Sequence, residues 1–318
     1  MKVLVTGAAG YIGSWLVPQL LAEGHEVTAL DTMYFGSGHL PKGNGMLTVV
    51  EGDILTEQDP CAGMDAVIHL AAMSNNAMCV SHPAISEKVN INGAIRIAEN
   101  AAKHRVRKFI YASSVAAYGS KDEEATETDE LRPETPYGQH KKAAEEYVKM
   151  LFPNAVVVRS ASVCGYSMNM AFHLTVNMMV NHACRTRKIT VNGGKQWRCH
   201  VHIADLCDVY KELLKSDIEA ETFNVVAQNM TVHHTAQIVQ SVTEPSRSPR
   251  YMAQLVVLPS EETRSYTVDG SKVQRMLKWV PQHSINDAIW DMKVRFQANY
   301  WPDSLSNKNY HRIRDDIV

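Results

Sequence analysis

Three evenly spaced glycines near the N-terminus constrain the fold of this chain more than any other feature. Gly7, Gly10 and Gly13 lie within Thr6–Gly13 and directly follow the apolar run Val3–Thr6. The first glycine permits a tight turn, the second lets a phosphate approach the backbone, and the third lets a helix pack closely against the preceding strand. The unpaired N–H groups at the start of that helix favour an anion. The pattern therefore predicts a buried strand, a phosphate-binding turn and a helix.

Short apolar runs alternate with longer amphipathic stretches through much of the chain. The predicted strands are Val3–Thr6, Glu26–Leu30, Leu47–Glu51, Ala66–Leu70, Lys108–Ala112, Ala155–Arg159 and, later, Thr222–Val226. The predicted helices include Ile91–His104, Tyr137–Leu151, Ala204–Lys215 and Ser284–Phe296. Apolar strands joined by helical crossovers form a parallel sheet that is buried on both faces. The predicted fold class is therefore α/β, with a doubly wound parallel Rossmann sheet and a smaller C-terminal substrate-binding part.

A carboxylate at the end of the second predicted strand bears on the identity of the ligand. Asp31 stands where an acidic residue can accept hydrogen bonds from the adenosine ribose hydroxyls of a dinucleotide. The same carboxylate would repel a 2′-phosphate, and no arginine follows it in Thr32–Gly38. Together with the glycine turn, Asp31 predicts NAD rather than NADP as the cofactor.

The alternation of strands and helices changes after about residue 165, where Gly165–Asn181 is rich in Met, Asn and aromatic residues. We therefore expect an NAD-binding Rossmann domain over 1–165 and a mainly substrate-binding domain over 166–318. The helices predicted at 204–215 and 284–296 are expected to pack back on the first domain. The methionines of Met168–Met179 suit either an adaptable wall beside the substrate or ordinary core packing.

Tyr137 and Lys141 are four residues apart in a predicted helix and therefore lie on the same face. A phenol is a poor base at neutral pH, but a neighbouring ammonium and a cationic nicotinamide both lower its pKa. Ser113 and Ser114 end the fifth predicted strand, where open α/β sheets bind ligands, so a serine hydroxyl could orient a substrate alcohol. Such a Tyr/Lys pair is common by chance on solvated helix faces, but behind a glycine turn it predicts an oxidoreductase.

Composition and charge exclude several other kinds of partner. The formal net charge is −2 and no Lys/Arg-rich run is present, so neither nucleic acid nor a membrane surface is expected as a partner. No stretch approaches the ~20 apolar residues of a membrane span, and we expect a cytoplasmic protein.

The six cysteines include no Cys-x-x-Cys pair, and Cys199-His200-x-His202 is followed by no second ligand pair. We therefore expect reduced thiols and no metal.

The sequence resembles the extended short-chain dehydrogenase/reductase family, specifically its NAD-dependent nucleotide-sugar epimerase/dehydratase branch. The resemblance covers nearly the whole chain and is carried by Thr6–Gly13, Gly52-Asp53-Ile54, His69–Ala72, Asn90–Gly93, Tyr111–Gly119, Pro136–Lys141, Arg159–Gly165, Arg198–Asp205 and Arg264–Lys272. It implies a catalytic triad of Ser114, Tyr137 and Lys141. It also implies a homodimer formed through the helices predicted at Ile91–His104 and Tyr137–Leu151.

The resemblance also implies residues that bind the cofactor and the substrate. Those for NAD are Gly7, Gly10, Tyr11, Ile12, Gly13, Asp31, Asp53, Ile54, Leu70, Ala71 and Ala72, together with Tyr137 and Lys141. Those for a nucleotide-diphosphate sugar are Ser74, Ser114, Ser162, Asn177, Arg198 and Arg264. The two arginines would bind the substrate diphosphate, a role suited to a planar and permanently charged side chain.

The sequence departs from the family pattern at several positions that bear on specificity. Dehydratases of this branch carry an Asp-Glu pair after the triad hydroxyl, whereas Val115 and Ala116 stand there in this chain and cannot transfer a proton. Ser162 replaces the usual asparagine, and Cys164 stands where an aromatic residue is common. For His140, beside Lys141, we expect an outward-facing side chain, with a local change in the active site as the alternative.

We therefore predict an enzyme, an NAD-dependent nucleotide-diphosphate-sugar epimerase of carbohydrate biosynthesis that acts through a transient 4-keto sugar. The alternative is an NAD-dependent dehydrogenase or 4-ketoreductase of a nucleotide-linked hexose or heptose, because the same triad serves both directions of hydride transfer. A dehydratase fits less well because Val115 and Ala116 replace its acid and base. A non-catalytic nucleotide-sensing protein fits less well because the triad is intact.

Overall fold

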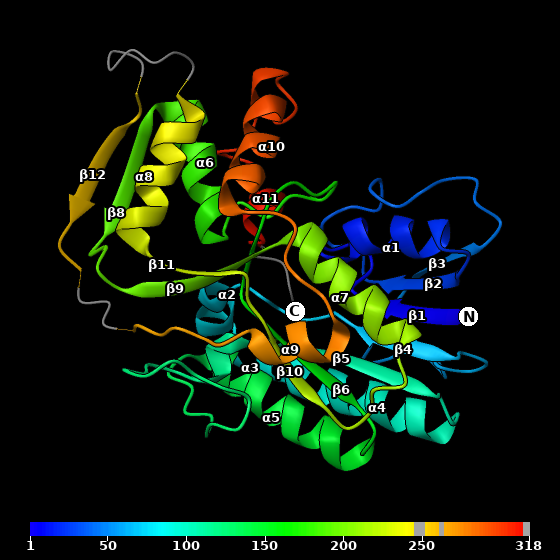
Figure 1. Cartoon of the computed structure of the whole chain (residues 1–318). Helices are drawn as coiled ribbons and strands as arrows, with labels where there is room; N and C mark the ends of the chain where they lie inside the picture. Colours follow the sequence, from blue (N-terminus) through cyan, green and yellow to red (C-terminus); the bar gives the residue numbers. More distant parts are fainter. Residues whose placement is uncertain (245–251, 261–263, 314–318) are drawn as a thin grey trace.

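Seven parallel strands form the central sheet of the protein, in the order β3-β2-β1-β4-β5-β6-β10 (Figure 1). The computed structural model describes residues 1–244, 252–260 and 264–313. The strands are β1 (Lys2–Thr6), β2 (Glu26–Asp31), β3 (Leu47–Glu51), β4 (Ala66–His69), β5 (Lys108–Ser114), β6 (Val156–Ser160) and β10 (Thr222–Val225). The order reverses between β1 and β4, and ligands of open α/β sheets bind at such a point, beyond the carboxyl ends of the strands.

Helices cover both faces of this sheet, which explains why its inner strands are almost continuously apolar. On one face lie α1 (Gly13–Ala22) and α7 (Ile203–Lys215), which contact each other, and on the other lie α4 (Gly93–Lys103) and α5 (Pro136–Leu151). Successive side chains of a strand point to opposite faces. In β1, Val3 and Val5 accordingly belong to the core beneath α1 and α7, whereas Leu4 belongs to the core beneath α4 and α5.

Short helical segments connect β4 to α4 and β5 to α5. They are α2 (Asn76–Ser81), α3 (Pro83–Glu87), the π-helical turn η1 (Lys88–Asn92) and the 3₁₀ turn η2 (Val115–Ala117). Helix α5 contacts α2, α3, η1 and η2 as well as β5. The helix that was predicted to carry Tyr137 and Lys141 is therefore fixed on more than one side.

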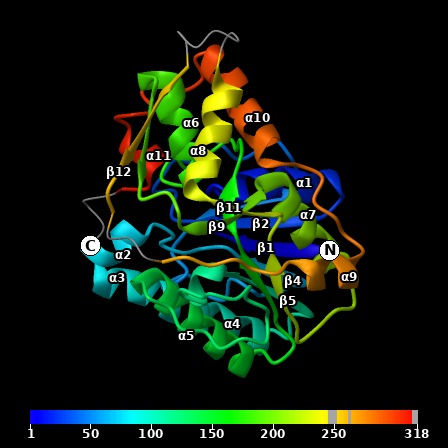
Figure 2. The same ribbon diagram turned by 60° about the vertical axis from the view of Figure 1, so that its left-hand side comes forward.

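The chain leaves the central sheet after β6 to begin a second, smaller part, returns through α7 to β10, and then adds the remaining elements of that part. This part contains a three-stranded sheet in the order β11-β9-β7, a parallel pair of β8 with β12, and three helices (Figure 2). Its strands are β7 (Ser162–Cys164), β8 (Lys188–Asn192), β9 (Trp197–His202), β11 (Gln228–Thr231) and β12 (Gln254–Leu258). Its helices are α6 (Thr175–Thr186), α8 (Val232–Thr243) and α10 (Ile285–Gln297), and α9 (Ser271–Leu277) and α11 (Lys308–His311) lie near the C-terminus.

The predicted α/β fold class is confirmed, and most predicted strand and helix limits differ from the observed ones by one or two residues. The boundary near residue 165 stays a prediction. The helix predicted at 204–215 does contact α1 and β5 of the main domain. The helix predicted at 284–296 instead has its principal contacts with α6, α8 and β9, because its apolar residues pack into the core of the smaller part.

Two further observations bear on expectations from the sequence. In the segment Met168–Met179, Met170 and Met179 are buried in the core, whereas Met168 is exposed, so core packing accounts for most of this segment. No helix in the described ranges is long and apolar enough to cross a membrane.

Candidate active site

The glycine turn after β1 has the close backbone contacts that a dinucleotide requires. Gly7 has a φ of +68°, and a Cβ atom there would lie 2.7 Å from the backbone nitrogen of Ala71. A Cβ atom on Gly13 would lie 2.6 Å from Ala8 Cα. Neither position therefore has room for a side chain, which keeps the turn tightly packed at the N-terminus of α1, where a dinucleotide phosphate would bind. These residues fit NAD.

Asp31 ends β2 beside this turn. Its carboxylate accepts hydrogen bonds from the backbone N–H groups of Ala9 (3.0 Å) and Met33 (2.8 Å), and burial raises its pKa. Each carboxylate oxygen has more than one acceptor position, so the group can still accept hydrogen bonds from ribose hydroxyls.

The other residues predicted to bind the cofactor lie at the same edge of the sheet. Leu70, Ala71 and Ala72 follow β4, where the N–H of Leu70 donates to the Thr6 carbonyl oxygen (3.1 Å) and that of Ala71 to Thr6 Oγ1 (3.3 Å). Asp53 and Ile54 follow β3, and Ile54 is buried. In the turn itself, Ile12 immediately precedes α1 and the Tyr11 hydroxyl donates to the Gly165 carbonyl oxygen (2.7 Å). The Tyr11 phenol is therefore engaged with the smaller part of the chain.

The three residues predicted to be catalytic meet at the carboxyl end of β5. Ser114 ends β5 close enough to the Tyr137 phenol to lower its pKa, and Tyr137 lies in the first turn of α5. Lys141 is one helical turn further on, and its Nζ is 5.8 Å from the centre of the Tyr137 ring. That ammonium donates to the Ala112 carbonyl oxygen (2.7 Å) and is almost completely buried.

Burial acts on both ionisable groups of this triad. It raises the pKa of Tyr137, and the Ser114 side chain opposes this only in part. It lowers the pKa of Lys141 to about 8. The sequence led us to expect a lowered Tyr137 pKa, but within the chain burial raises it instead. A cation that binds beside the phenol, as the oxidised nicotinamide ring would, lowers the pKa of the phenol.

Glu145 and Arg159 form a buried charged pair next to this triad, which the sequence analysis missed. Glu145 is one turn beyond Lys141 on the same face of α5, and its carboxylate accepts from Arg159 Nη2 (2.6 Å), Arg159 Nε (3.1 Å) and Ser113 Oγ (2.9 Å). Arg159 Nη1 also donates to the Tyr118 hydroxyl (2.8 Å). Burial alone would raise the Glu145 pKa, but the hydrogen bonds and charges of Arg159 and Lys149 lower it. The pair thus connects α5 to β5 and β6.

The expectation for His140 was wrong. Its side chain does not face outward but is buried, and the Asn90 side-chain amide donates to its ring Nδ1 at 3.4 Å. The reason is that α5 packs against η1 as well as against the sheet, so a second face of the helix is covered. The Asn90 amide in turn accepts from the Met73 N–H (2.7 Å) and donates to the Met73 carbonyl oxygen (3.2 Å), which fixes the loop after β4.

The residues predicted to bind substrate are placed in different environments. Ser74 is exposed in the loop before α2, and Ser162 is half-buried at the start of β7. Arg198 and Arg264 come together, because Arg198 Nη1 donates to the Arg264 carbonyl oxygen (2.6 Å). Their roles in binding the diphosphate stay predictions.

Asn177, a predicted substrate contact, is hydrogen-bonded within the protein. It is completely buried, accepts from the Gly165 N–H (3.1 Å), and donates to the Tyr11 hydroxyl (3.1 Å) and the Ala171 carbonyl oxygen (3.2 Å). Both ends of its amide are therefore occupied within the protein. The side chain holds the segment after β7 against the glycine turn.

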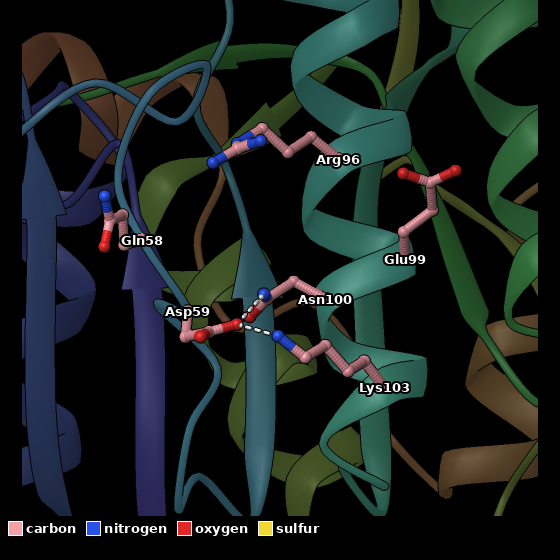
Figure 3. Close-up of a pocket in the computed structure, with 6 residues that line it drawn as sticks. All are labelled: Gln58, Asp59, Arg96, Glu99, Asn100 and Lys103. Carbon is pink, nitrogen blue, oxygen red and sulfur yellow. Dashed lines mark hydrogen bonds and ion pairs between the residues drawn. The ribbon is translucent and has the colours of Figure 1, made fainter.

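A polar hollow on the protein surface lies outside the predicted site. It is lined by Gln58, Asp59, Arg96, Glu99, Asn100 and Lys103 (Figure 3). Asp59 accepts from Asn100 Nδ2 (3.0 Å), Lys103 Nζ (2.5 Å) and His104 Nε2 (3.0 Å), and these donors hold its pKa below the usual range. Because this carboxylate is already paired, and none of the predicted site residues lines the hollow, we do not assign the active site to it. Within the described ranges, no group of three or more His, Cys, Asp or Glu residues could hold a metal ion.

Comparison with known proteins agrees with this geometry. The model of the NAD dependent epimerase/dehydratase family matches residues 3–226. The chain belongs to the NAD-dependent epimerase/dehydratase family. This family member is 30% identical over 314 residues to a UDP-glucose 4-epimerase of Mycolicibacterium smegmatis, an alignment that covers 91% of this chain and 96% of that protein. A UDP-glucose 4-epimerase of Lactobacillus helveticus is 27% identical over 324 residues, with 91% of this chain and 95% of that protein covered.

Solved structures of UDP-glucose 4-epimerases share the same fold. UDP-glucose 4-epimerase of Thermotoga maritima with UDP-glucose has a TM-score of 0.85 and 26% sequence identity, covering 95% of this chain and 100% of that one. UDP-glucose 4-epimerase of Thermus thermophilus in complex with NAD has a TM-score of 0.81 at 23% identity, covering 93% and 99% of the two chains. The family, the NAD cofactor and the enzyme class predicted from the sequence are confirmed, and the predicted epimerase activity agrees with these relatives.

Proposed function

We propose that this protein is an NAD-dependent 4-epimerase of a UDP-hexose, which interconverts the sugar and its C4 epimer. The observation that carries the proposal is the triad of Ser114, Tyr137 and Lys141 beside the glycine turn, with no proton-transferring side chain at Val115 or Ala116. The identity of the nucleotide follows the relatives named above, which are UDP-glucose 4-epimerases. Arg198 and Arg264 are the residues that we propose for the diphosphate.

The side chains of the triad have separate tasks in this reaction. When bound, NAD would supply the hydride acceptor and donor for C4, and inversion would require the keto sugar to rotate between the two transfers so that the hydride returns to its opposite face. The Tyr137 phenolate takes the proton of the C4 hydroxyl as the ketone forms and gives it back when the alcohol forms again. Ser114 orients that hydroxyl, and Lys141 supplies a fixed positive charge next to the phenolate. Since every proton and hydride is returned, the sugar and its epimer have the same composition.

The environment of other candidate groups argues against an elimination of water. Burial raises the pKa of Cys164 to about 12, so this thiol stays protonated at neutral pH and cannot act as a base. Burial also lowers the pKa of His173 to about 3 and shifts that of His182 downward, so neither is a ready acid. Val115 and Ala116 have no ionisable atoms. A dehydratase needs a group to take the C5 proton and one to protonate the leaving C6 hydroxyl.

The test is to incubate the purified holoenzyme with UDP-glucose in deuterated water and to analyse the sugar by NMR and mass spectrometry. We expect the C4 epimer to accumulate to equilibrium without solvent deuterium on carbon, because the same hydride leaves and returns. UDP-N-acetylglucosamine and the GDP-, CDP- and dTDP-sugars serve as alternative substrates. A product lighter by one water, or deuterium at C5 or C6, would refute the epimerase and favour a dehydratase.

The absorbance of NADH during the same reaction distinguishes the epimerase from the alternative, a net dehydrogenase or 4-ketoreductase. A sustained change in absorbance with a keto or acid product identifies the alternative, because its cofactor is not recycled. If no sugar of the panel is altered and the absorbance does not change, the result would favour a non-catalytic nucleotide-sensing protein.

We further propose a homodimer formed through α4 and α5. These helices pack against each other, and α5 exposes the large apolar side chains of Tyr147 and Met150 to solvent. Burying them against a second copy would remove apolar surface from water. Light scattering on wild type and on Met150→Glu tests the proposal. The variant should be monomeric, and an unchanged mass in the two proteins, or a monomeric wild type, would contradict this interface.

We also propose that the enzyme works in the cytoplasm, in carbohydrate biosynthesis. All six cysteines are free thiols, and five of them are buried, which suits a reducing compartment. The proposed product class, a nucleotide-activated sugar, is the donor form used by glycosyl transfer. Cell fractionation with an antibody against the full chain, together with the UDP-sugar pool of a deletion strain, tests both statements.

A further inference from the structure

The segment Lys308–Ile313 near the C-terminus is fastened over the dinucleotide-binding edge of the sheet. Figure 1 shows α11 in red, below α10. The backbone N–H of Phe172 donates to the Tyr310 carbonyl oxygen (2.6 Å), and Asn75 Nδ2 donates to the His311 carbonyl oxygen (3.0 Å). Asn75 lies in the loop that follows β4, just beyond the residues predicted to line the cofactor. The segment therefore spans from the smaller part to the cofactor edge.

Arg312 extends from this segment toward the glycine turn. Its side chain is only 7% exposed, its Nη2 donates to the Asn169 carbonyl oxygen (3.0 Å), and its guanidinium lies over the Phe35 ring at 4.5 Å. Asn169 Nδ2 in turn donates to the Ala9 carbonyl oxygen of the glycine turn (2.6 Å). Arg312 is also close enough to Asp31 for each charge to shift the pKa of the other. The guanidinium thus stands beside the adenosine side of the predicted NAD site.

The described part of the chain leaves one nitrogen of the buried Arg312 guanidinium without a hydrogen bond. Arg312 Nη1 is buried and has no hydrogen-bond partner among the described residues. Burial lowers the Arg312 pKa to about 10. A buried charge is costly unless an opposite charge and hydrogen bonds satisfy it. An anion that enters at the glycine turn would supply both, and the diphosphate of NAD is such an anion.

We propose that Arg312 is a cofactor-binding residue that contacts the diphosphate of NAD. The segment Lys308–Ile313 would then complete the cofactor site. The planar guanidinium suits a phosphate because it can donate two parallel hydrogen bonds. The proposal goes beyond the proposed reaction, since it concerns how the cofactor is held and does not depend on which sugar is converted.

The test is calorimetric titration of the full chain, stripped of nucleotide, with NAD, ADP and adenosine. In Arg312→Gln we expect NAD and ADP to bind roughly 10- to 100-fold more weakly, the range for a hydrogen bond to a charged group. Adenosine lacks the diphosphate, so its affinity should change less than about twofold in the same variant. The matched control is Arg275→Gln, because Arg275 is exposed on α9 and donates to Ser271 Oγ.

Each other outcome has a definite meaning. Unchanged binding of NAD and ADP in Arg312→Gln would overturn the proposal. Arg312 would then have only a structural role, through its hydrogen bond to Asn169. Tighter binding would also overturn it, because the segment would then obstruct the cofactor. If Arg312→Gln does not fold, Arg312→Lys keeps the charge but loses the planar fork, and its ADP affinity should fall while its adenosine affinity does not. The epimerase test above can fail independently, since it measures the sugar.

Discussion

Removing one partner of the buried pair of Glu145 and Arg159 should destabilise the protein strongly. The perturbation is Arg159→Met, which keeps the apolar stem and removes the guanidinium. The two side chains are 2% and 5% exposed, and two parallel N–H···O bonds join them. After the substitution, the Glu145 carboxylate would stay buried without its main counter-charge.

The size of the effect follows from that burial. Breaking a buried ion pair by removing one partner costs about 3–5 kcal/mol, because an uncompensated charge remains. The shift in melting temperature is this loss divided by the entropy of unfolding, which is roughly 2 cal/mol/K per residue. For a chain of 318 residues the melting temperature should therefore fall by roughly 4–8 °C. Glu145→Met combined with Arg159→Met should recover most of the loss, since no buried charge is left.

The assay is thermal and chemical unfolding at pH 7 with a fixed, saturating concentration of NAD, because ligand concentration alone shifts the midpoint. Lys149→Met is the matched control: Lys149 also pairs with Glu145 (2.6 Å), but its side chain is 42% exposed, so its loss should cost less than about 1 kcal/mol. If Arg159→Met is no less stable than Lys149→Met, the reasoning from burial is refuted.

The pH dependence gives a second check on the same pair. The pKa of Glu145 is lower in the folded protein than in the unfolded chain, where it is about 4.3. The pair therefore stabilises the fold above that pH, and its contribution is lost as the pH falls through the folded-state pKa. In Arg159→Met, burial without the guanidinium raises the Glu145 pKa, so the stability difference between wild type and the variant should be largest near about pH 8 and shrink as the pH falls. A difference independent of pH would contradict the assignment.

Three further substitutions test the site directly. Tyr137→Phe should lower kcat by roughly 10²–10⁴-fold with little change in NAD affinity, and a steady-state rate above about a tenth of wild type would exclude a general-base role. Gly13→Ala should weaken NAD binding by at least about tenfold, because its Cβ would meet the backbone of the turn at 2.6 Å, and titration with NAD checks this. Asp31→Ala should narrow the preference for NAD over NADP, and an unchanged ratio of the two Kd values would show that Asp31 does not read the ribose.

Much of the central fold could be predicted because its signals are local. The limits of β1 and β3 follow from apolar runs bounded by turn residues, and the triad follows from the four-residue spacing of Tyr137 and Lys141 on one helix. The phosphate-binding turn is also local, since its glycines are contiguous with the strand that they follow.

What could not be predicted depends on contacts between distant segments. The burial of His140 results from η1, which lies about fifty positions earlier, and the hydrogen bonds of Asn177 with Gly165 and Tyr11 join segments more than 150 positions apart. Arg312 reaches the glycine turn from the opposite end of the chain. For the pair with Glu145, one signal was available: Arg159 is a charged residue in an otherwise apolar strand, and such a residue requires a buried partner.

The late return of the chain to the central sheet has a consequence for its synthesis. Strand β6 ends at Ser160, but its outer neighbour β10 begins only at Thr222, after the strands β7, β8 and β9 have been made. At the usual rates of elongation, roughly 5–20 residues per second, β6 lacks this partner for several seconds while it leaves the ribosome. An apolar strand with a free edge readily pairs with other chains. The nascent enzyme is therefore most exposed to aggregation, and most dependent on chaperones, during the interval in which residues 161–221 are being translated.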